Sequence, residues 1–190
     1  DCLSLFGTNS FNLVWEGICA DIMHNQLDTN LGSITLPKRL KPGYDKNQKL
    51  RELIEKPLWT ITGERAKDTL IPDLITIRGN QFIIFDAKYY NAKLEPGIAP
   101  KGQPGIESIT KQYLYQLAYK KFIEDHSFIS VKNCFLMPTE NKEVEARGEV
   151  SMEMLSSLGL QDIKVIFLPA EYVYEHYLAE KKMDIESLNL

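Results

Sequence analysis

The sequence contains few cysteines, no long apolar run and no excess of positive charge. Its three cysteines, Cys2, Cys19 and Cys134, are odd in number and far apart, which fits neither a disulfide framework nor a CxxC metal site. No apolar run approaches the roughly 20 residues that span a bilayer, and the first residues lack the basic-then-apolar pattern of a signal peptide. A formal net charge of −4 provides no general attraction to nucleic acid or anionic membranes. These absences predict a cytoplasmic protein with reduced thiols and no membrane association.

Several catalytic signatures are also absent. No stretch resembles a Walker A loop, so the chain is not expected to bind or hydrolyse a nucleotide. His24, His126 and His176 share no metal-ligand spacing, and no nucleophile elbow is present. We therefore interpret the histidines as structural or surface residues.

What the sequence does contain is the composition of one globular domain. It has 190 residues, of which 44% are hydrophobic and 25% charged, and this is enough to bury a substantial core. No internal repeat or convincing domain boundary is visible, so residues 1–190 are predicted to form a single domain. Because the chain opens on Asp1 and not on methionine, we expect this domain to be the C-terminal part of a longer subunit.

The pattern of apolar residues predicts a mixture of helices and strands. From residue 9, apolar positions 11, 14, 15, 18, 19, 22 and 23 follow the spacing of an amphipathic helix, with Asn9 or Ser10 as N-cap. Composition then predicts strands at about 58–62, 70–78 and 81–90 and a helix over 107–125. The last part predicts strands from 131, over 143–151 and from 163, a short helix over 151–157 and a closing helix from about 169. This order predicts an α/β fold with a mixed sheet flanked by helices.

One segment is locally basic. Residues 37–51 (PKRLKPGYDKNQKLR) contain six basic residues and one aspartate. A solvated loop and a phosphate contact are equal alternatives for this segment.

A tight hairpin is predicted at Gly79-Asn80, because glycine accepts the positive φ that a two-residue turn needs. The turn fixes a register in which opposite residue numbers sum to 159, so Asp73 faces Asp86, and Lys88 lies on the same side of the sheet. The Cβ atoms of opposed residues are about 5 Å apart, where like charges are destabilising. A cation that prefers oxygen ligands, above all Mg²⁺, would relieve this repulsion, and Lys88 would then act on water or phosphate. The hairpin thus indicates a metal-dependent phosphodiesterase centre.

The hairpin alone also allows a purely structural interpretation. Asp73 would then follow Pro72 at the start of a strand, and Asp86 would pair with Lys88 at the end of one. The geometry of the hairpin does not decide between these two interpretations.

The segment Pro72-Asp73, followed by Asp86-Ala87-Lys88 after the apolar run FIIF, resembles the PD-(D/E)XK nuclease signature. This resemblance implies a restriction-endonuclease-like fold with the core order αβββαβ. It also implies that Asp73, Asp86 and the Ala87 carbonyl bind Mg²⁺, or Mn²⁺ in its place, while Lys88 assists the attacking water.

Two predicted helices extend the resemblance. Glu16 lies at the rim of the apolar stripe of the first helix, where the superfamily often supplies another acid to the metal, although a solvated glutamate is the alternative. On the second helix, Gln112 resembles the start of a QxxxY element, but Gln116 stands where that element has tyrosine. Lys111 is either a phosphate contact or a plain surface lysine. Lys111, Gln112 and Gln116 are expected to contact DNA or to support the residues that do.

More narrowly, the segments FGTNSFNLVWEGIC, LIPDLI, FDAKYY and KQYLYQLAY look like the LlaJI-type restriction endonuclease family, relatives of the McrC nuclease subunit. The likeness implies the nuclease domain of a restriction subunit that cuts double-stranded DNA beside an McrB-like AAA+ partner. Cutting both strands with one active site per chain would need two protomers or two nicks, so homodimerisation on DNA is one alternative. Two other functions remain open. They are a repair or recombination exonuclease of the same fold, and a nuclease-like module that only binds DNA or assembles with other subunits.

Overall fold

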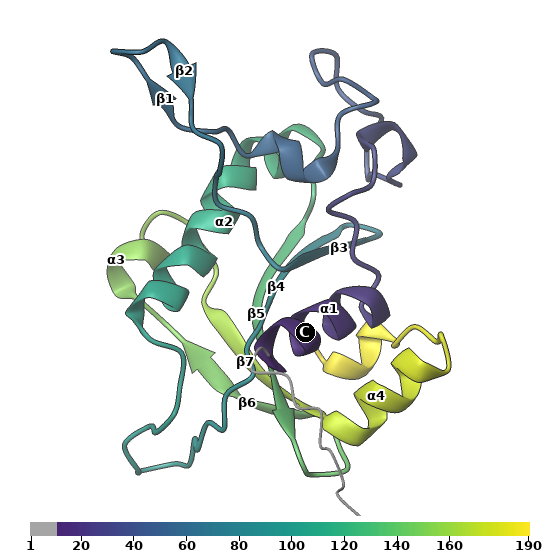
Figure 1. The fold of residues 1–190 in the computed structure, drawn as a ribbon, viewed down its shortest axis with the longest axis vertical. Coiled ribbons are helices and arrows are strands. Elements are labelled where there is room, and N and C mark those ends of the chain that lie inside the picture. Colours follow the sequence, from purple (N-terminus) through teal and green to yellow (C-terminus); the bar gives the residue numbers. More distant parts are fainter. Residues whose placement is uncertain (1–10) are drawn as a thin grey trace, which may run out of the picture.

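A five-stranded mixed sheet lies at the centre of the computed structural model, which describes residues 11–190 (Figure 1). The strand order is β3-β4-β5-β7-β6, in which β4, β5 and β7 are parallel and the two edge strands are antiparallel to their neighbours. The predicted mixed sheet flanked by helices is therefore confirmed. Its elements are α1 (Phe11–Ile22), β3 (Leu74–Arg78), β4 (Gln81–Ala87), α2 (Ile106–Asp125), β5 (Ser130–Thr139), β6 (Glu145–Val150), α3 (Glu153–Ser156), β7 (Ile163–Pro169) and α4 (Ala170–Leu178).

Helices cover both faces of the sheet. α1 and α4 pack on one face, where Trp15 and Val173 share a core with Phe85 of β4. α2 covers the other face, where Tyr119 packs with Phe82 of the same strand. Phe82 and Phe85 enter different cores because successive strand residues point to opposite faces. Each such fully buried large side chain contributes about 1.5–3 kcal/mol to stability.

The hairpin of β3 and β4 has the predicted register. Ile75 pairs with Ile84 and Ile77 with Phe82, and Gly79 adopts a positive φ of 54° in the turn. The strands are shorter than predicted, since β3 begins at Leu74 and β4 ends at Ala87. Asp73 and Lys88 therefore lie just beyond the paired residues, at one end of the hairpin.

The strand predicted at residues 58–62 does not join the central sheet. Only β1 (Leu58–Trp59) forms there, and it pairs with β2 (Glu64–Arg65) as a separate two-stranded ribbon. Trp59 is 63% exposed and Ile61 is 93% exposed, so the apolar side chains that suggested a strand bury little surface. In the central sheet two strands, and not three, precede α2, so this part of the predicted core order is wrong.

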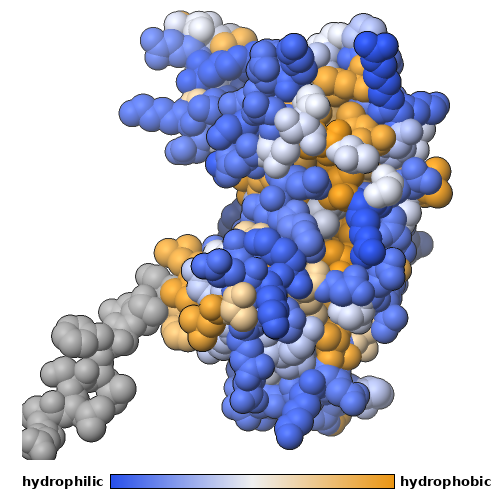
Figure 2. Space-filling model, turned by 90° about the vertical axis from the view of Figure 1, so that its right-hand side faces the viewer, coloured by the Kyte–Doolittle hydropathy of each residue, from blue (hydrophilic) through white to orange (hydrophobic). Residues whose placement is uncertain are grey.

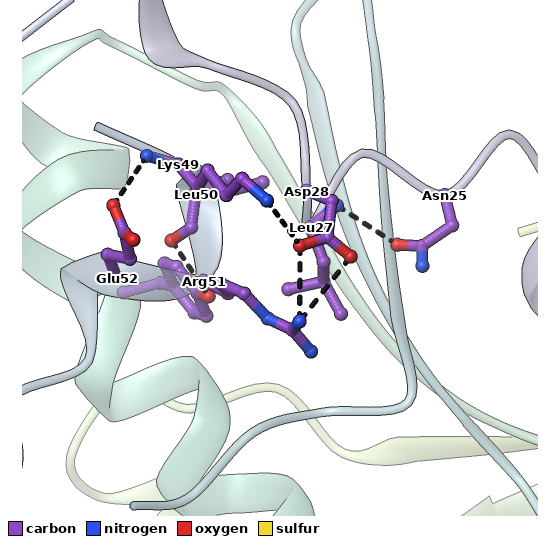
Figure 3. A network of polar contacts seen from close by, with 8 residues as sticks. Asn25, Leu27, Asp28, Lys49, Leu50, Arg51 and Glu52 are labelled. Atoms are coloured by element: carbon purple, nitrogen blue, oxygen red, sulfur yellow. Dashed lines mark hydrogen bonds and ion pairs between the residues drawn. The ribbon is translucent and has the colours of Figure 1, made fainter. Parts of the chain in front are cut away.

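The basic segment at residues 37–51 is partly neutralised by ion pairs. Lys49 and Arg51 both reach Asp28, at 3.3 and 3.1 Å, as Figure 3 shows, and Lys41 pairs with Asp125. Near the start of the 3₁₀ helix η2 (Leu50–Leu53), the Lys49 amide donates to Glu52. Half of the six basic side chains thus have a local acidic partner, which favours the interpretation as a loop for those three residues.

The segment before β1 also contains the 3₁₀ helix η1 (Leu31–Ser33), and a further one, η3 (Ile185–Leu188), closes the chain. The upper part of the face shown in Figure 2 is dominated by hydrophilic side chains, with apolar ones visible between them.

Cys19 and Cys134 are buried and free. Cys2 and the predicted N-cap residues, Asn9 and Ser10, lie outside the described residues. Within residues 11–190, no helix is both long and apolar enough to cross a bilayer.

Candidate active site

Asp73, Asp86 and Lys88 meet at the end of the β3–β4 hairpin. Lys88 Nζ lies 2.7 Å from Asp86 Oδ2 and 4.0 Å from Asp73 Oδ2. Asp73 Oδ2 also accepts a 2.8 Å hydrogen bond from the backbone amide of Ala87. This bond fixes Asp73 against the last residue of β4, although Asp73 itself precedes β3. The sequence prediction that these three side chains share one surface therefore agrees with the structure.

The Ala87 backbone also faces this group. In a strand the N–H and C=O of one residue point to the same side, as the paired bonds of antiparallel ladders require. Since the Ala87 N–H donates to Asp73, its carbonyl is directed to the same side, beyond the first residue of β3. The Ala87 carbonyl thus adds an uncharged oxygen beside the carboxylates of Asp73 and Asp86.

The three charged side chains are largely shielded from solvent, with side-chain exposures of 19% for Asp73, 6% for Asp86 and 18% for Lys88. Burial, and then the negative charge of Asp73, raise the pKa of Asp86 from 3.8 to about 7, even though Lys88 acts in the opposite direction. Burial tends to lower the pKa of Lys88, but the carboxylates of Asp86, Asp73 and Glu16 outweigh it and leave this pKa above 10.5. The metal-free site therefore holds an ammonium between acids that repel each other.

α1 reaches the same place through Trp15. The indole nitrogen of Trp15 donates to the Leu136 carbonyl at 3.2 Å, and the Lys88 amide donates to the same oxygen at 2.8 Å. One carbonyl on β5 thus ties α1 to the end of β4, and Glu16 follows directly after Trp15. Burial and the charge of Asp73 raise the pKa of Glu16, while Lys88 lowers it, so Glu16 lies within electrostatic range of the hairpin acids.

The three residues predicted on α2 lie in different surroundings. Gln112 is fully buried and its side-chain nitrogen donates to the Ile84 carbonyl at 2.9 Å, which attaches α2 to β4. Lys111 pairs with Glu107 at 2.6 Å on the exposed side of the helix. Gln112 therefore packs beneath the site, whereas Lys111 remains at the surface.

Gln116 has structural partners of its own. Its side-chain oxygen accepts a hydrogen bond from the Asn133 side chain and another from the Gln161 amide, both at 2.8 Å. The residue is only 5% exposed. The Gln116 side chain therefore joins α2 to β5 and to the segment before β7. Its oxygen serves the fold and does not contact the acids of the hairpin.

Sequence reasoning missed the roles of Trp15 and Tyr115. Trp15 was recognised only as part of an apolar stripe, because its bond to β5 joins positions 121 residues apart. Tyr115 is buried on α2, and the charges of Asp86 and Asp73 add to burial in raising its pKa. Its position one helical turn after Gln112 was the available signal for this proximity.

The donor set fits a hard cation that keeps part of its water shell. In residues 11–190, no group of three or more histidine, cysteine or acidic side chains is arranged to hold a metal ion. Mg²⁺ in proteins commonly uses only one or two carboxylates and retains several waters. Asp73 and Asp86 supply two carboxylates, and burial together with the charge of Asp73 raises the pKa of Asp86. Asp73, Asp86 and the Ala87 carbonyl could therefore hold Mg²⁺, with Glu16 nearby.

Comparisons with known proteins identify the family of the chain. Residues 1–171 match a protein family described as "LlaJI restriction endonuclease". The chain is also 30% identical over 196 residues to a Bacillus subtilis (strain 168) protein named "Type II restriction enzyme BsuMI component YdjA". That match covers 98% of this chain and 36% of the relative, so the chain spans about a third of the relative's length. No solved structure matches the chain significantly. With the family matched over most of its length, the chain belongs to the LlaJI restriction endonuclease family.

Proposed function

We propose that the protein is a Mg²⁺-dependent DNA endonuclease of the PD-(D/E)XK type, which hydrolyses phosphodiester bonds as the cleavage part of a restriction system. The observation that carries the proposal is the convergence of Asp73, Asp86 and Lys88 at one shielded end of the hairpin. Membership of a restriction endonuclease family supports it, because the same three residues form the motif that resembles nuclease sequences.

The chain's own groups have distinct roles in this proposal. Asp73 and Asp86, with the Ala87 carbonyl and Glu16, would hold the ion, and Ala87 N–H keeps Asp73 oriented. When bound, the ion would polarise the phosphate and neutralise charge that develops on it. Lys88 has a raised pKa and is therefore an ammonium, which favours donating a hydrogen bond to water or phosphate over removing a proton. Water oxygen forms a bond to phosphorus and releases a proton to solvent, while one phosphorus–oxygen bond to sugar breaks and the leaving sugar oxygen takes up a proton.

The exonuclease alternative loses part of its support. A polar stripe of Gln112, Gln116 and Tyr119 on α2 would favour it, but the Gln116 side-chain oxygen is occupied by Asn133 and Gln161. The endonuclease proposal does not need Gln116. In this proposal the substrate is double-stranded DNA, cut by one subunit of a restriction system beside an McrB-like AAA+ partner that hydrolyses the nucleotide. Two protomers would assemble on DNA where both strands are cut.

Nicking of circular DNA tests the proposal. Wild-type protein is expected to convert supercoiled circles to open and linear forms with Mg²⁺ and not with chelator, since a strict exonuclease spares circles. Asp73→Asn and Asp86→Asn should lose this activity, because each removes a charged metal ligand. Asp28→Asn is the matched control, since the ion pairs that Asp28 forms within residues 11–190 are surface contacts with Lys49 and Arg51.

The same preparations give the contradicting outcomes. Absence of Mg²⁺-dependent nicking by the wild type, or full activity in either site variant, would falsify the assignment. Melting temperatures of all variants separate a lost site from a lost fold.

A further inference from the structure

A cavity of about 460 Å³ opens beyond the carboxyl ends of β4, β5 and β7. Its wall begins at Tyr89, the residue directly after Lys88, and continues through Tyr90 to Asn141 and Arg147, with Phe167 also lining it. In Figure 1 the loop that follows β4 and the turn between β5 and β6 both lie at the lower end of the sheet, and residues of both line the cavity. The cavity therefore lies beside the candidate active site, at the same end of the sheet.

The guanidinium in this cavity is paired with a glutamate that does not line it, and Glu140 adds an acidic side chain to the wall. Arg147 pairs with Glu145, to which its Nε donates at 2.6 Å, and its guanidinium lies 5.4 Å from the centre of the Phe167 ring. The Asn141 side chain donates to the same glutamate. A paired guanidinium gives little attraction to a phosphate, so the cavity is not suited to an anion. Exposed rings and neutral hydrogen-bonding groups suit a flat, uncharged and polar ligand.

Tyr90 is the ring in the cavity wall best placed to meet such a ligand. Tyr89 already packs against Phe11 and Trp15, with ring centroids 4.8 and 6.2 Å away. Tyr90 is 39% exposed and, among residues 11–190, has no aromatic neighbour at stacking distance. An accessible aromatic face of this kind stacks on nucleobases without regard to their sequence.

We propose that this cavity receives one nucleobase of the strand being cut, from the nucleotide next to the phosphate held at Lys88, with Tyr90 as its stacking partner. This inference rests on the proposed nuclease function. Tyr90 is two residues beyond Lys88, a distance of about 7 Å along an extended chain. That distance is about two base steps of a stacked strand, at roughly 3.4 Å each, and an unstacked nucleotide can span it. The cavity lies within the roughly 300–1,000 Å³ of ligand sites.

In this proposal, stacking adds an attraction to DNA that does not depend on charge, in a chain whose net charge is −4. A base inside a duplex stack cannot enter a cavity, so the nucleotide must be unpaired or turned out, as in other enzymes that take bases from the stack. The proposed site would therefore favour DNA in which the strand is open or frayed beside the scissile phosphate.

Binding of two oligomers with equal charge tests the inference. One is an oligothymidylate of about 12 nucleotides, and the other has the same backbone but no bases. Ca²⁺ is expected to support little cleavage because its coordination shell is larger and looser than that of Mg²⁺. Calorimetry in Ca²⁺ should show about 5- to 150-fold tighter binding of the thymidylate by wild type, from one stacked base. Tyr90→Ala should lose most of this preference and Tyr90→Phe should keep it. Tyr177→Ala is the matched control, because Tyr177 is 43% exposed on α4 and does not line the cavity.

The outcomes separate this inference from the proposed function. Equal binding of both oligomers by the wild type, or an unchanged preference in Tyr90→Ala, overturns the base site even if Mg²⁺-dependent nicking is observed. A preference that depends on Tyr90 supports the base site, and if nicking is then independent of Asp86, the nuclease assignment fails and the cavity remains a base-binding site. The melting temperature of Tyr90→Ala shows whether the fold is intact, which is expected for a half-exposed side chain.

Discussion

Replacement of Asp86 by asparagine tests whether the acids of the hairpin form a coupled, metal-seeking pair. Burial and the charge of Asp73 raise the pKa of Asp86 to about 7, so ionising Asp86 in the folded protein is unfavourable without a metal. Asparagine has nearly the same size and cannot ionise. We therefore expect Asp86→Asn to be more stable than the wild type in chelator, wherever the wild-type carboxyl is charged.

The sign of the pH dependence follows from which state holds the proton. Between about pH 4 and pH 7 the folded wild type keeps a proton on Asp86 that the unfolded chain has released, so the free energy of unfolding falls as pH rises. Each pKa unit corresponds to about 1.4 kcal/mol, which gives a total loss of about 4 kcal/mol above pH 7. About 3 kcal/mol of this falls between pH 5 and pH 8, equivalent to roughly 6–12 °C in melting temperature for a chain of this size.

The assay is thermal melting of wild type, Asp86→Asn and the control Asp28→Asn at pH 5 and pH 8, in chelator and in Mg²⁺. Relative to Asp86→Asn, the wild type and the control should both lose stability at pH 8 in chelator. Mg²⁺ should restore the wild type, because the ion binds the folded, ionised pair and not the unfolded chain. Parallel pH dependence in wild type and Asp86→Asn, or equal stabilisation of both by Mg²⁺, would refute the reasoning.

Three further outcomes are expected. Lys88→Ala should lose turnover yet still bind Mn²⁺ in calorimetry, because an ammonium is not a metal ligand; loss of Mn²⁺ binding would contradict this. Trp15→Phe keeps an aromatic ring but loses the five-membered ring and one hydrogen bond at a fully buried position, so we expect a loss of about 1–3 kcal/mol in stability. Since Glu16 is then held less firmly, cleavage should need more Mg²⁺, and an unchanged Mg²⁺ dependence would show that Trp15 only packs. Gln116→Leu removes the acceptor of one Asn133 N–H and of the partly buried Gln161 amide, and should cost about 1–3 kcal/mol in stability. Nicking at low temperature should persist, and lost nicking in a folded variant would place Gln116 in the site.

The candidate site was predictable because its geometry is local. A two-residue turn at Gly79-Asn80 fixes which residues oppose each other, and the alternation of strand side chains then places Asp73, Asp86 and Lys88 on one surface. Residues joined by so short a hairpin remain close together however the rest of the chain packs. The same locality explains why the boundaries of α2, β5 and β7 were close to those expected from periodicity and composition.

The strand at residues 58–62 shows where local reasoning was insufficient. Its aromatic and β-branched residues are typical of a strand, yet Trp59 is largely exposed and the ribbon stands apart from the central sheet. Strand propensity reflects packing on neighbouring strands more than an intrinsic preference of the backbone. Because those neighbours are distant in sequence, propensity alone could not exclude this segment from the sheet.

The sequence by itself thus determined the hairpin, its register and the three charged residues at its end, since these depend on contacts within about 16 residues. Only the tertiary structure decided what surrounds them. The Leu136 carbonyl brings Trp15 and the Lys88 backbone together, and Gln116 binds Asn133 instead of joining the acids. These contacts require β5 to lie between β4 and β7, because hydrogen-bond partners in a mixed sheet are set by strand order, which local periodicity does not encode.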